Sequence, residues 1–204
     1  MAPTLAEKTQ QTQTTLLEAA WRVLLSEGYA GLSTRAVARA AGAPMSQIQY
    51  HFGSKQGLVL ALFEHMNAQL LARQEALFAD PRRPLSEQWE RACDYLDDDL
   101  ASGYVRVLHE LIGASLANPQ IQATVREGMQ GWHALLGQVA RRFEASRGPL
   151  PGLDADALVA LVSAAFIGAE AQILLGLEGA ALPTRRALRQ VGALIRAAEP
   201  TPHP

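Results

Sequence analysis

Three adjacent side chains, Met45, Ser46 and Gln47, have the chemistry that is needed to read base edges in DNA. A glutamine amide can form two hydrogen bonds with adenine or donate to guanine, and a methionine can contact the methyl group of thymine. Arg35 can reach either guanine or a phosphate oxygen. Five neighbouring residues have side chains that suit the phosphate backbone: Thr34, Gln49, Tyr50, His51 and Lys55. Together these residue types predict contact with double-stranded DNA.

Two short helices joined by a tight turn would position these side chains. Ser33 is a good N-cap for a helix over residues 34–41, and Gly42 suits the left-handed conformation that redirects the chain after it. Pro44 suits the start of a second helix over 44–51, because it lacks an N–H group where no acceptor exists. We expect a helix-turn-helix whose second helix enters the major groove.

Ile48 is the one strongly apolar residue of that second helix, so it would anchor the helix in a small core. Its expected neighbours are Val37 and Leu24, the latter on a preceding helix. Burial of Ile48 would turn the three base-reading candidates outward. We expect Phe52 to pack against the next helix, whereas His51 either packs there or contacts a phosphate.

Charge and composition limit where DNA can bind and which kinds of cysteine site can occur. The chain has 204 residues, of which 49% are apolar, and a formal net charge of −2. Residues 1–60 carry five basic and three acidic groups, which leaves 13 basic and 17 acidic groups in the remainder. This asymmetry suits a DNA contact at the N-terminal end. The single Cys93 excludes an internal disulfide and a multi-cysteine zinc site.

Hydrophobic periodicity predicts helices throughout and no strand, so we expect an all-α fold. The nine expected helices cover residues 12–27, 34–41, 44–51, 54–78, 86–102, 104–117, 120–146, 154–177 and 183–198. We divide the chain into a flexible N-terminus (1–11), a DNA-binding domain (12–57), a ligand-binding and dimerisation domain (58–198) and a disordered tail (199–204). No uninterrupted apolar run of membrane-spanning length occurs, so we expect no membrane contact.

Residues 14–63 resemble the N-terminal domain of the TetR family of one-component bacterial transcriptional regulators. The matching signature is a first helix that ends in EGY, the segment LSTRAVARAAG and, after the turn, YHFGSKQGL. Many family members place a phosphate-gripping tyrosine where this chain has Gln49, with Tyr50 in the next position. Either of these two residues can therefore take that contact. Over residues 80–204 the resemblance is architectural only.

The resemblance implies that a small molecule binds among the central helices and that the last two helices form a homodimer. The residues support the second point, because the segment 154–177 is rich in small apolar side chains that let helices approach closely. The residues expected at the dimer interface are Leu158, Leu161, Val162, Ala165, Ala169, Ile173, Leu188, Val191, Leu194 and Ile195.

The middle helices mix aromatic residues with isolated polar groups, which is the usual composition of a ligand pocket. The pocket candidates are Trp89, Tyr95, Tyr104, His109, Trp132, His133, Phe166 and Glu170. Asp97, Asp98 and Asp99 are expected to form a solvated face. Because three adjacent acids point in different directions around a helix, we expect no metal site there, and we expect no cofactor.

These observations predict a cytoplasmic, homodimeric regulator, a repressor that a small-molecule effector releases from operator DNA. The release mechanism is implied by the family resemblance. An activator or corepressor-type DNA binder is the first alternative, and an all-α small-molecule carrier is an alternative from another class. We expect no enzymatic activity, because no nucleophile–base pair, metal-ligand spacing or phosphate-binding loop occurs.

Overall fold

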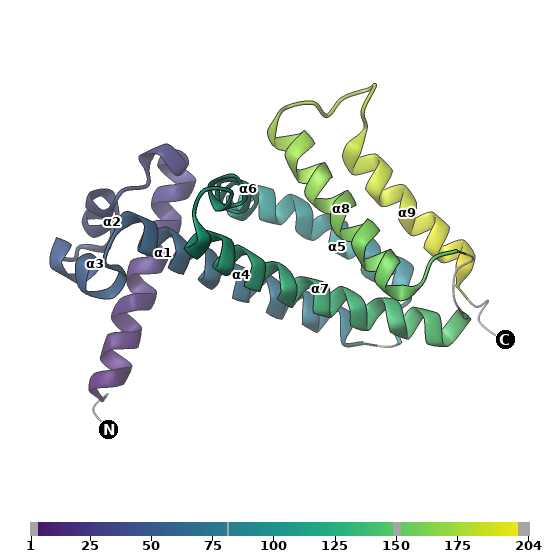
Figure 1. Cartoon of the computed structure of the whole chain (residues 1–204), viewed down its shortest axis with the longest axis horizontal. Coiled ribbons are helices and arrows are strands. Elements are labelled where there is room, and N and C mark those ends of the chain that lie inside the picture. Colours follow the sequence, from purple (N-terminus) through teal and green to yellow (C-terminus); the bar gives the residue numbers. More distant parts are fainter. Residues whose placement is uncertain (1–3, 81, 149–151, 200–204) are drawn as a thin grey trace. The chain divides into compact units, whose positions relative to one another are not determined.

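The computed structural model describes residues 4–80, 82–148 and 152–199, and within these ranges it contains nine helices and no strand (Figure 1). The all-α prediction is therefore confirmed for the described chain. The helices are α1 (Leu5–Gly31), α2 (Thr34–Ala41), α3 (Met45–Phe52), α4 (Lys55–Phe78), α5 (Leu85–Ala101), α6 (Tyr104–Ser115), α7 (Pro119–Arg147), α8 (Ala155–Leu174) and α9 (Thr184–Ala198).

Helix α1 begins at Leu5, seven residues before the expected start at residue 12. A capping box explains this difference. The Glu7 amide donates to Thr4 Oγ1 at 3.2 Å, and the Thr4 amide donates to Glu7 Oε2 at 2.6 Å. Each residue thus satisfies an N–H group that the first turn leaves without a partner. The segment expected to be flexible is helical from Leu5 onward.

The chain divides into two compact units. The first contains Met1–Ala68 and Ser102–Val125, and the second contains Gln69–Ala101 and Arg126–Pro204. Helices α4 and α7 therefore contribute residues to both units.

The first unit is built around the three N-terminal helices. Helix α2 packs against α1 and α3. The apolar core of the first unit includes the fully buried side chains of Leu16, Val37, Ile48, Leu58 and Phe63.

Two contacts tie α6 and its preceding loop to the core of the first unit. The Trp21 indole N–H donates to the Ser102 carbonyl at 2.8 Å. The Tyr104 ring stacks on Phe63, with centroids 5.9 Å apart, while its hydroxyl donates to Asn67 Oδ1 at 2.8 Å. Since each aromatic residue buries a large apolar surface and satisfies its polar atom, these contacts hold α6 to α1 and α4.

The second unit is held together by α9, which packs against α5 and α8. One of its buried clusters contains Cys93, Leu96, Phe166, Ala169 and Leu188. The Trp89 indole N–H donates to the Leu188 carbonyl at 2.7 Å.

At the C-terminal end of the second unit, Glu199 accepts hydrogen bonds from the Ser86 amide at 2.7 Å and the Ser86 hydroxyl at 2.8 Å. Of the tail predicted to be disordered, residues 200–204 lie outside the described residues.

The aspartates of α5 form ion pairs with other helices, which corrects the prediction of a solvated acidic face. Asp97 contacts Arg185 at 2.6 Å and Arg189 at 3.2 Å on α9. Asp99 binds Arg73 on α4 through contacts of 2.7 and 2.8 Å. The side chain of Asp98 is 59% exposed, and its Oδ2 lies 3.9 Å from Arg73 Nη1. All three acids therefore pair with arginines of other helices, and Asp98 makes the longest of these contacts.

Candidate nucleic-acid interface

The turn between α2 and α3 follows from three local features. Ser33 Oγ accepts a hydrogen bond from the Ala36 amide at 3.1 Å and so caps α2. Gly42 has a left-handed conformation, with φ 62° and ψ 27°, which ends α2. Pro44 precedes the first residue of α3, and its carbonyl accepts from the Gln47 amide at 3.0 Å. The predicted cap and the predicted left-handed glycine are both present.

Helix α3 has one buried face and one exposed face. Ile48 is 1% exposed and Phe52 is 9% exposed, so these two residues anchor the helix in the first unit. Met45 is 48% exposed, Ser46 is exposed and Gln47 is half-buried. The three base-reading candidates therefore lie together at the N-terminal end of α3 and are accessible from outside the unit.

The candidates for phosphate contact surround this end of α3. Gln49 and Lys55 are exposed, whereas Thr34 and His51 are half-buried. Tyr50 is 76% exposed.

This exposure leaves the Tyr50 hydroxyl accessible as a hydrogen-bond donor to a group outside the unit. The Tyr50 ring meets the His51 ring edge-on, with centroids 5.0 Å apart. Arg35 is exposed at the start of α2, so it is available for a base or a phosphate.

Two features of this surface were missed by the sequence reasoning. Residues 28–63 contain no Asp or Glu but include Arg35, Arg39 and Lys55, so the local charge is more positive than the count over 1–60 indicates. The second feature is Tyr29, whose ring centroid lies 5.6 Å from Lys55 Nζ. The acid-free run could have been found by local counting, whereas the contact of Tyr29 with Lys55 depends on the fold.

The eight pocket candidates are divided between the two units. Tyr104 and His109 belong to the first unit, and the other six belong to the second. Tyr104 is buried against Phe63 and hydrogen-bonded to Asn67, so it is a core residue. Tyr95 packs under the guanidinium groups of Arg73 and Arg91, at 4.1 and 4.9 Å from its ring centroid.

The remaining aromatic candidates pack on one another. The Trp89 and Phe166 rings have centroids 5.6 Å apart, and the Trp132 and Phe166 rings 6.1 Å. Trp132 also donates its indole N–H to Gln74 Oε1 at 3.1 Å. Glu170 is 9% exposed in the same unit. Sequence composition cannot separate a packed aromatic core from a cavity lined by aromatics, because both need the same residue types.

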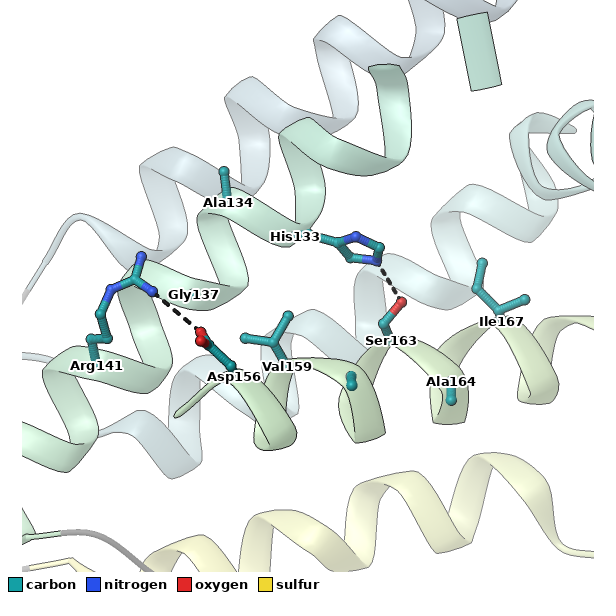
Figure 2. A pocket seen from close by; sticks show the side chains of 10 residues that line it. His133, Ala134, Gly137, Arg141, Asp156, Val159, Ser163, Ala164 and Ile167 are labelled. Carbon is teal, nitrogen blue, oxygen red and sulfur yellow. Dashed lines mark hydrogen bonds and ion pairs between the residues drawn. The ribbon is translucent and has the colours of Figure 1, made fainter. Parts of the chain in front are cut away.

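His133 is the one pocket candidate that lines a groove between α7 and α8, shown in Figure 2. This groove has a volume of about 670 Å³. Two polar pairs join its walls. His133 Nε2 and Ser163 Oγ share a hydrogen bond of 2.8 Å, and Arg141 Nη1 lies 3.7 Å from Asp156 Oδ1. The remaining lining residues are small or apolar: Ala134, Gly137, Val159, Ala160, Ala164 and Ile167.

Residues 16–62 match the family model described as "Bacterial regulatory proteins, tetR family". This range contains α2, the turn, α3 and the start of α4, which are the elements that build the exposed polar face. Over these residues the chain is similar to the TetR family. The resemblance inferred from the EGY, LSTRAVARAAG and YHFGSKQGL segments is thus confirmed.

A curated relative is the HTH-type transcriptional regulator CymR of Pseudomonas putida. The two are 34% identical over 131 residues, which cover 62% of this chain and 60% of CymR. The match thus spans less than two thirds of the length of that relative.

Two solved structures share the fold of the whole chain. A putative transcriptional regulator from Saccharomonospora viridis, in complex with choline, has a TM-score of 0.74 at 23% identity, covering 92% of this chain and 96% of that one. FadR from Bacillus subtilis, in complex with stearoyl-CoA, has a TM-score of 0.68 at 17% identity, covering 92% and 99%.

The residues predicted for the dimer interface differ in exposure. The exposed ones are Leu161 at 56%, Leu194 at 70% and Ala165. The half-buried ones are Leu158, Val191 and Ile195. Val162 and Ile173 pack against the internal cluster that contains Ala169 and Leu188. Ala169 and Leu188 are buried within their own subunit, because α9 covers that face of α8.

Helix α8 is unusually apolar for a helix so poorly covered. Its mean hydropathy reaches 1.9, and 22% of the apolar window is buried. By length and composition alone, α8 could cross a membrane. This was not expected from the sequence, because only uninterrupted apolar runs were considered. Helices in the core or interface of a protein can have the same composition.

Proposed function

We propose that this chain is a transcriptional regulator, a repressor that binds operator DNA as a homodimer and is released by a small-molecule effector. The observation that carries the proposal is the exposed polar end of α3, which lies opposite the buried anchor Ile48 in a segment without acidic residues. The family match and the relatives named as transcriptional regulators support it. Such a protein acts on DNA in the bacterial cytoplasm.

Base reading falls to Met45, Ser46 and Gln47, with Arg35 as a further contact to guanine or phosphate. We assign the phosphate contact of the family tyrosine to Tyr50, because its side chain is 76% exposed and can reach a phosphate without leaving a packed core. Thr34, Gln49, His51 and Lys55 hold the backbone around it.

In a homodimer, a second copy of the chain covers the exposed apolar face of α8 and α9. Leu161 on α8 and Leu194 on α9 are more than half exposed, although the residues around them are apolar. Covering this face with a second copy removes apolar surface from water. A twofold dimer also places two α3 helices on two half-sites of a palindromic operator.

Effector binding belongs to the helices that follow the DNA-binding domain. The structural neighbours from Saccharomonospora viridis and Bacillus subtilis hold choline and stearoyl-CoA, so this fold accommodates chemically different small molecules. In this chain an effector shifts the equilibrium between DNA-binding and released conformers by its difference in affinity for the two.

A gel-shift titration tests the proposal. Purified protein is mixed with the intergenic DNA upstream of its own gene and with a scrambled duplex of the same composition. We expect a discrete complex with the first DNA at concentrations where the second stays free. The absence of a sequence-specific complex on this DNA, and on any sequence selected from a random pool, would favour the all-α carrier. Stronger DNA binding with an added effector would indicate a corepressor system.

A further inference from the structure

The geometry points to the groove between α7 and α8 as the site of an apolar carboxylic acid, with its carboxylate on Arg141 and a second polar group beside His133 and Ser163 (Figure 2). This inference deepens the proposed function, on which it rests only for the effect of the ligand on DNA binding. The binding itself requires no DNA and can be measured separately.

The groove has the size and the walls of a small-molecule site. Its volume of about 670 Å³ lies within the range of ligand pockets. Small residues create the space, since alanines and Gly137 occupy positions where larger side chains would fill it. Val159 and Ile167 add apolar surface along α8. Such walls favour a ligand with an apolar body.

The end of the groove at Arg141 favours an anion. A Cβ added at Gly137 would lie 3.0 Å from Arg141 Nη2, so the glycine allows the guanidinium to lie close against α7. The contact of Arg141 with Asp156 is 3.7 Å long, and the two side chains are 60% and 92% exposed. An exposed pair of this kind contributes little. A ligand carboxylate can replace it with two parallel, charge-assisted hydrogen bonds to the guanidinium.

The other end of the groove offers a hydrogen-bonding pair. Ser163 is 8% exposed, and its hydroxyl is hydrogen-bonded to His133 Nε2 across the two helices. Asp156 and Ser163 lie seven residues apart on α8, which corresponds to about 10 Å along the helix axis. The ligand therefore carries its carboxylate and its second polar group about 10 Å apart.

Substitutions of Asp156 and Arg141 should change the affinity for the ligand in opposite directions. The Asp156 carboxylate competes with the ligand for Arg141 and repels the ligand's own charge. Removing the charge of Asp156 should strengthen binding, whereas removing the charge of Arg141 should weaken it. A groove that takes up apolar molecules without regard to charge would respond to neither change.

The experiment is isothermal titration calorimetry on the full chain without DNA. The probes are ω-hydroxyoctanoate, octanoate and octanediol. Only the first combines a carboxylate with a hydroxyl group at the required separation. We expect the affinity to fall in that order. Arg141→Met should weaken binding of ω-hydroxyoctanoate about tenfold or more, whereas Asp156→Asn should strengthen it about two- to fivefold. The matched control is Arg142→Met, which removes the same charge from the next, exposed position.

Three results would overturn the assignment: equal binding of octanediol and ω-hydroxyoctanoate, equal binding by the Arg141→Met and Arg142→Met proteins, or no saturation by about 10 mM probe. Loss of probe binding as the protein dimerises would identify the groove as a subunit contact and would equally overturn it. A failed gel shift with intact probe binding would instead remove the regulator proposal and leave the site.

Discussion

Tyr29 is brought beside Lys55 by a backbone turn. Gly28 has φ 69° and ψ −178°, a conformation outside the helix that is costly for residues with a side chain. The turn places the Tyr29 ring 5.6 Å from Lys55 Nζ, within the range of a cation–π interaction. Lysine side chains are flexible, so a ring that restrains the ammonium lowers the entropy cost of binding a phosphate.

We therefore predict that Tyr29→Leu weakens operator binding about two- to fivefold per subunit, the range of a cation–π contact. Tyr29→Phe, which keeps the ring, should bind nearly as the wild type does. Fluorescence anisotropy with a labelled operator measures both. In a Lys55→Ala background, Tyr29→Leu should have no further effect. A full additional loss there would show that Tyr29 acts independently of Lys55.

Asp99 predicts a pH dependence of stability. Burial raises the pKa of this carboxyl to about 6, against the opposing effect of the Arg73 guanidinium and with a further upward contribution from Glu170. The folded state thus holds the proton more tightly than the unfolded chain does. The free energy of unfolding should therefore rise, relative to an Asp99→Asn variant, as the pH falls from about 6 to 3.8.

Urea unfolding across this pH window measures the difference. Asp98→Asn is the matched control, because the Asp98 side chain is 59% exposed and its contact with Arg73 is longer, at 3.9 Å. If the wild type and Asp99→Asn proteins changed in parallel over the whole window, Asp99 would not titrate with a raised pKa.

At this scale, the sequence predicted residue types better than their contacts. Met45, Ser46 and Gln47 were identified as exposed candidates because Ile48 had to be buried. The pairing of Asp97 and Asp99 with arginines could not be predicted, since it depends on helices distant in sequence.

At the scale of elements, the ends of α2 follow from local chemistry. Ser33 caps its first turn, and Gly42 ends it in the left-handed region. Both features were predicted because caps depend on neighbouring residues alone. The early start of α1 was missed, although Thr4 and Glu7 have the spacing of a capping box.

Gly42 and Gly113 should respond oppositely to substitution by alanine. Neither glycine has an atom within 4 Å of an added Cβ, so sterics with neighbours do not distinguish them. Gly42 has a φ of 62°, so Gly42→Ala should lower the free energy of unfolding by about 1–2 kcal/mol. Gly113 lies in α6, where Gly113→Ala should raise it by about 0.5–1 kcal/mol. Thermal and urea unfolding report both changes, and stabilisation by Gly42→Ala would contradict the backbone argument.

The aromatic residues of the middle helices show what composition leaves open. The mixture of aromatic and polar residues made Trp89, Trp132 and Phe166 pocket candidates, and both tryptophan rings contact Phe166. Whether inward residues enclose a cavity or fill it depends on how side chains from several helices interlock. Here the three rings pack on one another, and the described groove lies between α7 and α8 instead.

For the whole molecule, α8 and α9 carry apolar surface that a single subunit leaves exposed. Leu161 is 56% exposed and Leu194 is 70% exposed. The sequence indicated this face through its small apolar residues but also assigned Ala169 and Leu188 to it, because composition alone does not reveal which side α9 covers.

We predict that Leu161→Glu converts the dimer to a monomer at about micromolar protein concentration, because it places a charge in an apolar interface. Size-exclusion chromatography with light scattering measures the mass. The matched control is Leu116→Glu, since Leu116 is 87% exposed at the end of α6 in the first unit. A Leu161→Glu protein that remained dimeric would exclude this face as the interface.

Selection of bound sequences from a random DNA pool tests whether α3 reads the bases of an operator. The wild-type protein and a Gln47→Ala variant are each used to enrich duplex DNA, and the recovered sequences are compared. We expect a palindromic motif for the wild type and a changed preference at matching positions of both half-sites for Gln47→Ala. No enriched motif, or an identical motif for the two proteins, would contradict sequence reading by α3.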